Sequence, residues 1–291
     1  MTRSKHPDEP SALLGPAEIR DLAEMLDVTP TKKLGQNFVH DPNTVRKIVR
    51  VGGVEPGDVV VEVGPGLGSL TLGLLEAGAS VVAIEIDRRL AAQLPLTVAQ
   101  LADASKLTVI ADDALRVVSL PEPASRLVAN LPYNISVPVL LHLLEHVPSI
   151  RSGVVMVQAE VGHRLAAEPG SKVYGGPSVK AAWYGRWRVA GQVSRQVFWP
   201  VPNVDSVLVG FERRASEDEL GDEELRRRTF DIVDAAFGQR RKMLRQALIP
   251  VFGDSGRAAS ALAAAGLPET ARGEQLDVDA FVALARVEPG S

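Results

Sequence analysis

The chain has 291 residues, 45% of them hydrophobic, which is enough apolar material for one large domain and a small one. It contains no cysteine, so disulfides, thiolate metal sites and a cysteine nucleophile are excluded. Its net charge is −4, yet residues 226–245 hold seven basic and two acidic side chains, a local charge of +5. Phosphate binding depends on local rather than overall charge, so this segment is a candidate nucleic-acid contact.

We expect no targeting signal in the first thirty residues. The chain has no run of eighteen apolar residues, and its start lacks both the hydrophobic core of a signal peptide and the Arg-rich, acid-poor character of a transit peptide. We therefore expect a cytoplasmic, monomeric protein with no membrane partner. Residues 1–30 are predicted to be an extension with a short amphipathic helix at 15–26. A second helix is predicted at 42–50, with Asp41 as its N-cap and Pro42 at its first position.

Residues 31–213 alternate between strand and helix patterns. Apolar, β-branched runs at 58–63, 80–86, 106–111, 126–130 and 153–159 are separated by helical stretches of ten to seventeen residues. This alternation predicts an α/β fold with a doubly wound, mostly parallel sheet buried on both faces. The runs at 188–194 and 206–214 are predicted to close one edge of the sheet as antiparallel strands.

The remainder, residues 214–291, has no strand pattern. Its acidic start, 215–228, is predicted to be a linker, and a small all-helical domain is expected to follow. Within that domain the Ala-rich segment 257–266 should form a helix that ends at Gly266.

A glycine-rich segment, VVEVGPGLGSLTLGLL, lies where the first sheet strand should turn into a helix. Gly64, Gly66 and Gly68 suit a turn in which backbone passes close to a ligand. The dinucleotide fingerprint is G-x-G-x-x-G, whereas the spacing here is G-x-G-x-G, with Pro65 between the first two glycines. The ligand is therefore predicted to be a nucleoside rather than a dinucleotide.

Two acidic residues follow the next two strands. Glu85, 21 residues after Gly64, can accept hydrogen bonds from both hydroxyls of a ribose, and Asp113 follows the third strand where an adenine amine could be met. Either acid could instead cap a helix or a turn. Together with the glycine loop, they favour S-adenosylmethionine as the cofactor, since it combines adenine, ribose and a charged methionine tail.

The segment LVANLPYNIS places an amide at the tip of the fourth strand. Asn130 should point into the same crevice as the glycine loop. If its side-chain oxygen and the carbonyl of Leu131 or Pro132 accept hydrogen bonds from an exocyclic adenine amine, the nitrogen is drawn toward tetrahedral geometry and its lone pair can attack a methyl group. Pro132 would fix the turn and Tyr133 would stack on the base.

Six motifs in order carry a specific resemblance. NLPY resembles the [D/N]-[P/L/I]-P-[Y/F/W] signature of amine-directed methyltransferases. The whole series resembles the adenine N6-dimethyltransferases of small-subunit ribosomal RNA over residues of roughly 16 to 286. The six motifs are KKLGQNFVHDP (32–42), VEVGPGLGSLT, AIEIDRRL, ANLPYNIS, FWPVPNVDSVLV (198–209) and AFGQRRKMLRQAL (236–248).

The resemblance implies the following reaction and residues. Two methyl groups pass in succession to N6 of each of two adjacent adenosines near the 3′ end of the 16S RNA. It implies that Phe198 helps Tyr133 to hold the flipped base, and that Val39, where the family often has Leu, contacts the cofactor through backbone atoms. The implied cofactor contacts are Asn37, Val39, Gly64, Glu85, Asp113 and Asn130, to which the glycine turn adds Gly66.

The basic residues of the sixth motif have two interpretations. Arg240, Arg241, Lys242 and Arg245 could form a solvated helix face, but their place beside an apolar stripe favours a phosphate-binding face. Trp183, Trp187 and Trp199 could stack on bases, although large aromatics more often fill cores. HLLEH at 142–146 matches a zinc-peptidase pattern, but no third ligand is marked, so we expect no metal.

Three other functions stay open at this point. A large-subunit RNA adenine methyltransferase of the antibiotic-resistance type would share every cofactor motif, and only the C-terminal helical segment argues against it. A non-catalytic ribosome-assembly factor would not need the clamp from Asn130 to Tyr133. An NAD-dependent dehydrogenase would need the G-x-G-x-x-G spacing that is absent here.

Overall fold

The computed structural model describes residues 13–28, 37–216 and 219–287, and the chain separates into two compact units. The first unit comprises residues 1–159 and 190–210, and the second comprises 160–189 and 211–291. The division predicted at residue 213 therefore does not coincide with the compact units, because residues 160–189 group with the C-terminal helices. In the part of the chain that is described, no helix is long and apolar enough to cross a membrane.

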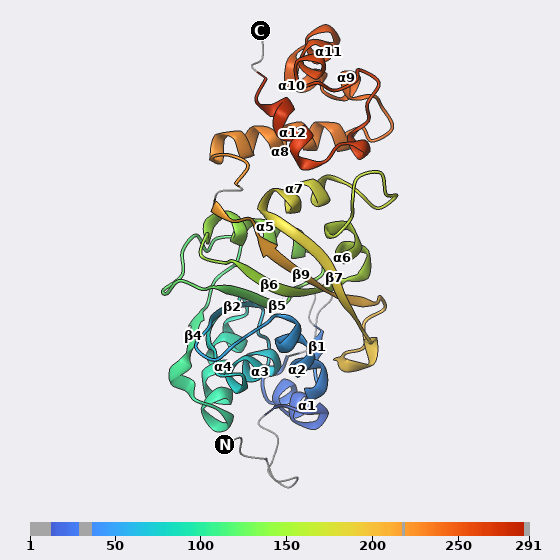
Figure 1. Ribbon diagram of the computed structural model, residues 1–291. Helices are drawn as coiled ribbons and strands as arrows, with labels where there is room; N and C mark the ends of the chain where they lie inside the picture. Colours follow the sequence, from blue (N-terminus) through green and yellow to red (C-terminus); the bar gives the residue numbers. More distant parts are fainter. Residues whose placement is uncertain (1–12, 29–36, 217–218, 288–291) are drawn as a thin grey trace. The chain divides into compact units, whose positions relative to one another are not determined.

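A seven-stranded sheet organises the fold (Figure 1). The strand order is β4-β3-β2-β5-β6-β9-β7, and the four pairings among the first five strands are all parallel. The order reverses between β2 and β5, and at such a switch point the two neighbouring connections leave in opposite directions and open a crevice. The strands are β2 (Val59–Val63), β3 (Ser80–Ile84), β4 (Leu107–Ile110), β5 (Arg126–Asn130), β6 (Ser152–Gln158), β7 (Gly185–Val193) and β9 (Ser206–Arg213).

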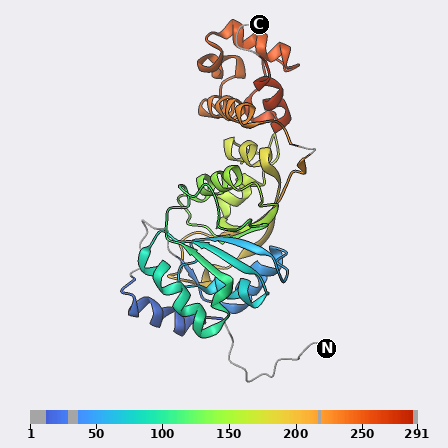
Figure 2. The ribbon, with the colours of Figure 1, turned by 90° about the vertical axis from the view of Figure 1, so that its left-hand side faces the viewer.

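Helices cover both faces of the parallel part of the sheet. The connections through α3 (Ser69–Glu76) and α4 (Arg88–Leu101) run one way along the sheet, and the one through α5 (Ser136–His146) runs the other way. Right-handed crossovers then place α5 on the face opposite to α3 and α4, an arrangement that Figure 2 shows from the side. Strand residues such as Val61, Val82 and Leu127 are fully buried, as expected for a sheet covered twice.

Three helices precede or interrupt this series. α1 (Pro16–Met25) lies in the predicted extension, and α2 (Pro42–Val51) begins as predicted, since Asp41 accepts from the backbone N–H of Thr44 at 2.8 Å. The short helix η1 (Ala104–Lys106) leads into β4. The prediction of a helix in every connection was wrong for residues 111–125, which form turns only. Pro121 and Pro123 in this stretch lack backbone N–H donors, which opposes a helix.

A small second sheet joins two distant motifs. β1 (Phe38–Val39) pairs antiparallel with β8 (Phe198–Trp199), which follows the short helix η2 (Arg195–Val197). The rings of Phe38 and Trp199 stack with 6.4 Å between centroids. This pairing places the start of the FWPVPNVDSVLV motif directly beside Phe38 and Val39 of the KKLGQNFVHDP motif, whose residues 32–36 lie outside the described part.

The second unit is built from helices around a common apolar core. α8 packs against α7 and α12, and Ile232, Val233 and Phe281 are fully buried. The prediction of a linker over 215–228 was wrong for its second half, because Asp222 caps α8 by accepting from Leu225 N–H at 2.9 Å. The helices are α6 (Ala159–Leu165), α7 (Gly176–Tyr184), α8 (Glu223–Gly238), α9 (Leu244–Ala247), α10 (Ile249–Phe252), α11 (Ser255–Ala264), η4 (Gly273–Gln275) and α12 (Val278–Ala285).

The tryptophans pack within the protein. Trp183 is 7% exposed and meets Phe230 edge to face, while Trp187 stacks on Phe211 with centroids 4.8 Å apart. Together with the stacking of Trp199 on Phe38, these contacts favour the interpretation of the tryptophans as packing residues.

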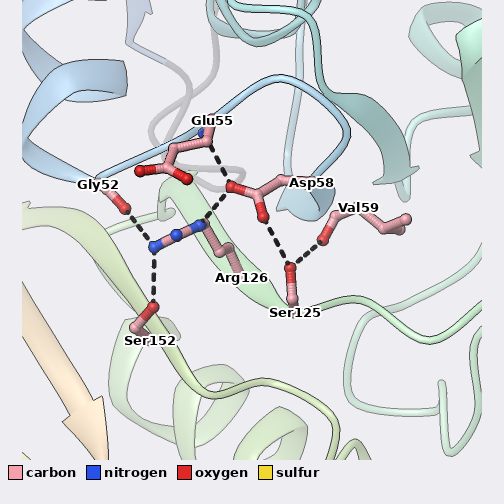
Figure 3. Close-up of polar contacts among 7 residues, drawn as sticks. All are labelled: Gly52, Glu55, Asp58, Val59, Ser125, Arg126 and Ser152. Atoms are coloured by element: carbon pink, nitrogen blue, oxygen red, sulfur yellow. Dashed lines mark hydrogen bonds and ion pairs between the residues drawn. The ribbon is translucent and has the colours of Figure 1, made fainter.

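The amino ends of the central strands are tied by a polar network (Figure 3). Arg126, at the start of β5, pairs with Asp58 through Nε and Oδ2 at 2.5 Å, and it donates from Nη1 to the Ser152 hydroxyl at 3.1 Å and to the Gly52 carbonyl at 3.3 Å. Asp58 also accepts from the N–H of Glu55 at 2.8 Å. These bonds connect the end of α2 with the starts of β2, β5 and β6.

Candidate active site at the carboxyl ends of the central strands

The turn after β2 requires glycine on steric grounds. Gly64 and Gly66 adopt φ values of +67° and +58°, in the left-handed region that side chains disfavour. A Cβ on Gly66 would also lie 2.8 Å from the ring of Phe38, closer than real carbon contacts allow. The turn therefore brings its backbone to the cavity wall with no side chain at Gly64 or Gly66 in front of it.

Glu85 connects this turn to the end of β3. It is 5% exposed, and its carboxylate accepts from the N–H of Gly66 at 3.1 Å and from the N–H of Asp87 at 2.9 Å. Burial raises the pKa of Glu85, and the two backbone donors oppose that rise. Each carboxylate oxygen keeps a second lone pair, so the group can still accept from a ligand in the cavity that it lines.

Two buried polar groups in the cavity wall were not predicted. Glu62 is 1% exposed and accepts from the Thr71 hydroxyl at 2.6 Å; burial raises the pKa of Glu62 to about 8, so it is protonated at neutral pH. The buried Ser69 Oγ has no hydrogen-bond partner among the described residues. An unpartnered buried hydroxyl is costly, so its presence in a cavity wall indicates a ligand with a polar group there.

Asn130 ends β5 directly across the switch point from the glycine turn. Its Nδ2 donates to the backbone carbonyl of Asn37 at 3.0 Å. This bond uses the amide's donor side and leaves Oδ1 as an acceptor, the atom that the clamp requires. The contact joins residues 93 positions apart in the chain, and sequence alone showed no sign of it.

The turn from Leu131 to Tyr133 is held on both sides. The Pro132 carbonyl accepts from Ile135 N–H at 3.3 Å, whereas the Leu131 carbonyl has no such partner in the described part of the chain. The hydroxyl of Tyr133, a half-buried residue, lies 2.7 Å from Ser206 Oγ on β9. Burial raises the pKa of Tyr133, against the opposing effect of Ser206. This contact fixes the direction of the ring.

Phe198 does not face the cavity. It is 1% exposed and belongs to the core cluster that also contains Phe38. Its backbone pairs with Val39 across the small sheet. Any contact between Phe198 and a ligand would therefore require its side chain to leave the core.

Seven predicted cofactor-binding residues line one cavity, whose volume with its open mouth is about 880 Å³. Asp113 also caps a turn, since its Oδ1 accepts from Leu115 N–H at 2.9 Å, so both interpretations of this residue apply. The cavity residues that were predicted are Asn37, Val39, Gly64, Gly66, Glu85, Asp113 and Asn130, and those that were missed include Phe38, Glu62, Ser69, Ile86 and Asp112.

Ile86 is the missed residue that a sequence signal could have revealed. It follows Glu85 at the end of β3, and it is 55% exposed although it is a large aliphatic residue. An apolar side chain exposed in a cavity beside a carboxylate suits the flat face of a base next to its ribose. Its place immediately after the acidic strand end was visible in the sequence.

Comparisons with known proteins show the family of the chain. Residues 29–285 match the family described as Ribosomal RNA adenine dimethylase. The Ribosomal RNA small subunit methyltransferase A of Leifsonia xyli is 74% identical over 275 residues, which cover 94% of this chain and 98% of that one. The protein of the same name from Nocardia farcinica is 60% identical over 94% of this chain and 95% of its own length.

The chain belongs to the ribosomal RNA adenine dimethylase family. Among solved structures, a dimethyladenosine transferase from Plasmodium falciparum shares the fold, with a TM-score of 0.71 at 23% identity over 85% of this chain and 95% of its own. The 23S rRNA methyltransferase ErmE has a TM-score of 0.64 at 26% identity, and covers 86% of this chain and 98% of its own.

The ErmE comparison corrects one argument made from sequence. A match to 86% of this chain is longer than residues 1–213 alone could supply, so the C-terminal helical region does not by itself separate rRNA methyltransferases of the two ribosomal subunits. The distinction comes from sequence identity, which is far higher to the small-subunit methyltransferases.

The basic segment of this dimethylase is a turn rather than a helix face. α8 ends at Gly238 and α9 begins at Leu244, with exposed side chains between them. Arg240 pairs with Glu274 at 3.2 Å, and Arg245 pairs with Glu269 at 3.6 Å. Within the described residues, the side chains of Arg241 and Lys242 make no ion pair or hydrogen bond.

The two histidines of the HLLEH pattern contact backbone carbonyls. His142 Nε2 contacts the Val117 carbonyl and His146 Nδ1 contacts the His142 carbonyl, each at 2.9 Å. The described part of the chain contains no group of three or more side chains placed to hold a metal ion.

Proposed function

We propose that this protein transfers methyl groups from S-adenosylmethionine to N6 of two adjacent adenosines near the 3′ end of small-subunit ribosomal RNA. The observation that carries the proposal is the orientation of Asn130, whose donor side is held by Asn37 and whose Oδ1 is left as an acceptor beside the cofactor cavity. Membership in the dimethylase family and high identity to small-subunit methyltransferases support it.

The residues of the cavity fit S-adenosylmethionine. Glu85 would accept from the ribose hydroxyls, Asp113 would meet the adenine amine, and Ile86 would lie against the base. The unpartnered Ser69 hydroxyl and the backbone of the turn at Gly64 would provide polar contacts for the methionine tail. When bound, the cofactor supplies a methyl group on a sulfonium, which is already a good leaving group.

The protein's part in the chemistry is to position and polarise the amine. Asn130 Oδ1 and the Leu131 carbonyl would accept the two amine hydrogens of adenine, which directs the nitrogen lone pair at the methyl group. The Pro132 carbonyl is the weaker candidate for the second acceptor, because it already accepts from Ile135. The proton can leave to water after attack, so a dedicated strong base is unnecessary. Rate acceleration then rests on orientation and on fixed dipoles.

The base and the RNA would be held by separate groups. Tyr133, with its hydroxyl fixed by Ser206, would stack on the flipped adenine. The contact expected of Phe198 requires its side chain to leave the core and stays a prediction. The segment that carries Arg240, Arg241, Lys242 and Arg245 would contact RNA phosphates.

Isotope mapping tests the reaction. The protein is incubated with methyl-labelled S-adenosylmethionine and small ribosomal subunits that lack these methyl groups, and the labelled nucleotides are located by mass spectrometry. We expect label on two neighbouring adenosines of the small-subunit RNA and none on large subunits in a parallel reaction. Label on large-subunit RNA alone, or no transfer to either, would refute the proposal.

Calorimetry tests the cofactor site. Glu85→Ala should weaken S-adenosylmethionine binding by about 1.5–3 kcal/mol, the range for hydrogen bonds to a charged group. Glu76→Ala is the matched control, since it removes a carboxylate that pairs with Arg46 on the surface and does not line the cavity. An unchanged affinity in folded Glu85→Ala protein would remove Glu85 from the site.

A further inference from the structure

The connection between α6 and α7 is docked on the basic turn within the second unit. Gly170 N–H donates to the Glu274 carbonyl at 2.7 Å, and Arg240 Nη2 donates to the Lys172 carbonyl at 2.8 Å. Tyr174 donates to the Leu276 carbonyl at 2.8 Å, and its ring meets the edge of Phe237. Three segments that are distant in sequence, residues 170–174, 237–243 and 273–276, therefore form one surface.

The basic side chains on this surface are of two kinds. Arg240 is paired with an acid, and the others, which we call the open cations, have no ion-pair partner among the described residues. Arg240 uses Nε on the Glu274 carboxylate and Nη2 on the Lys172 carbonyl, so it neutralises an acid and holds a loop. The side chains of Lys172, Arg241 and Lys242 are exposed and make no ion pair or hydrogen bond within the described residues. The Lys172 backbone is bonded to the residue that directly precedes Arg241, so the three open cations lie on adjoining backbone segments.

We propose that Lys172, Arg241 and Lys242 form a single phosphate-binding surface for RNA, and that Arg240 positions Lys172 rather than binding phosphate itself. The inference rests on the proposed function and adds to it a contact from the loop before α7, which carries no basic run and gave no signal in the sequence. It also divides the basic turn into two residues that bind phosphate, Arg241 and Lys242, and one residue, Arg240, that positions Lys172.

An RNA backbone is the partner that this arrangement fits. The nearby carboxylates of Glu274 and Glu269 are neutralised by Arg240 and Arg245. The open cations therefore make the electrostatic potential at this surface positive. Long cationic side chains that no ion pair holds suit contacts to successive phosphates, to which Lys172 and Lys242 would offer point charges and Arg241 a planar fork of donors. Val173 and Met243, 43% and 40% exposed, add apolar area beside them that can lie against sugars or bases.

Salt titration tests the surface. Binding of the full chain to a short RNA duplex of arbitrary sequence is measured over a range of salt concentrations. Each neutralised phosphate contributes roughly 0.7–0.9 to the slope of log affinity against log salt. Lys172→Ala, Arg241→Ala and Lys242→Ala should each lower the slope by about that amount. Arg257→Ala is the matched control, because Arg257 is an exposed arginine on α11 that lies outside the three segments and outside residues 226–245, and its slope should equal that of the wild type.

A double variant separates positioning from binding. If Arg240 acts through Lys172, then Arg240→Ala, Lys172→Ala and the double variant should all lose the slope of one phosphate contact. A loss of two contacts in the double variant would show that Arg240 binds phosphate directly and would overturn its positioning role. By contrast, Lys172→Ala combined with Arg241→Ala should lose two contacts, because each binds separately. Thermal unfolding of each variant confirms that the fold is retained.

The outcome is independent of the proposed reaction. A wild-type slope in folded Lys172→Ala protein would overturn the shared surface even if methyl transfer to small subunits were intact. Conversely, the predicted slopes with the RNA duplex, together with no methyl transfer to small subunits, would support the surface and refute the proposed reaction.

Discussion

The two ends of β5 show how one strand serves stability at one edge of the sheet and chemistry at the other. Arg126, at the amino end, has its charge and donors satisfied by Asp58, Ser152 and Gly52. Asn130, at the carboxyl end, uses only its donor and keeps its acceptor open. A polar group whose hydrogen bonds are all made within the protein stabilises the fold. A polar group that keeps an unused donor or acceptor can bind a ligand.

The carboxylates of the two edges differ in the same way. Burial raises the pKa of Asp58, but the donors Glu55 N–H and Arg126 outweigh that effect and hold the pKa below its usual value. At the other edge burial prevails and raises the pKa values of Glu62 and Glu85. The carboxyl groups with raised pKa values therefore lie where the ligand would bind, as is typical of functional sites.

The largest expected effect is on the rate at the carboxyl edge. Asn130→Ala should slow methyl transfer about 10²–10³-fold, because it removes an acceptor that acts mainly in the transition state. Single-turnover transfer to small subunits at saturating cofactor measures this, and RNA affinity should barely change. Asn130→Asp keeps an acceptor oxygen and should retain more activity than Ala. Wild-type rates in Asn130→Ala protein would show that the NLPY segment is only a structural turn.

The next effect is on stability at the amino edge. Arg126→Ala should lower the free energy of unfolding by about 2–3 kcal/mol, because it leaves Asp58 partly buried without its cation. Urea unfolding gives this value, while cofactor affinity of the folded variant should match the wild type. Arg151→Ala serves as control, since this exposed arginine lies at the same edge, just before β6, and its change should stay within about 0.5 kcal/mol. A loss of cofactor affinity in Arg126→Ala would contradict the separation of the two edges.

The two edges should also respond oppositely to pH. The pKa of Asp58 is lowered, so its contribution to stability is present above the ordinary aspartate range and is lost as pH falls through the folded value. The pKa of Glu62 is raised from 4.5 to about 8, so its contribution is present at acid pH and is lost as pH rises through that interval. Glu62→Gln should flatten the decline of unfolding free energy between pH 5 and pH 8, measured by urea titration, and leave the acid limb unchanged. An unaltered decline would mean that Glu62 is ionised throughout.

The smallest effect concerns the hydroxyl contact behind Tyr133. Ser206→Ala removes a neutral hydrogen bond worth about 0.5–1.5 kcal/mol, so methyl transfer should fall about 2–12-fold as the ring loses its fixed direction. Tyr133→Phe should give a similar loss, and combining the two should add nothing. Tyr133→Ala should cost more, because it removes the stacking surface as well. Additive losses from Ser206→Ala and Tyr133→Phe would contradict the shared contact.

Several features of the fold formed as local sequence preferences predict, without being changed by tertiary contacts. The cap of α2 at Asp41 and the helix end at Gly266, with φ of +71°, formed where their residue types predict. Residues 111–125 and 223–228 did not match prediction. In the first stretch the spacing of the neighbouring strands suggested a helix that Pro121 and Pro123 oppose, and in the second the acidic run concealed an N-cap at Asp222.

What the sequence by itself determined is the carboxyl edge of the sheet: the turn at Gly64, the acid at Glu85 and the amide at Asn130. Each follows a strand, and parallel strands present their carboxyl ends at one edge, so position along the chain was enough to collect them. Only the tertiary structure decided which bonds these groups still lack. The Asn37 carbonyl on Asn130, the unpartnered Ser69 hydroxyl and the Arg126 network depend on residues far apart in the chain. Burial and hydrogen-bond satisfaction are properties of such neighbours, and no local pattern encodes them.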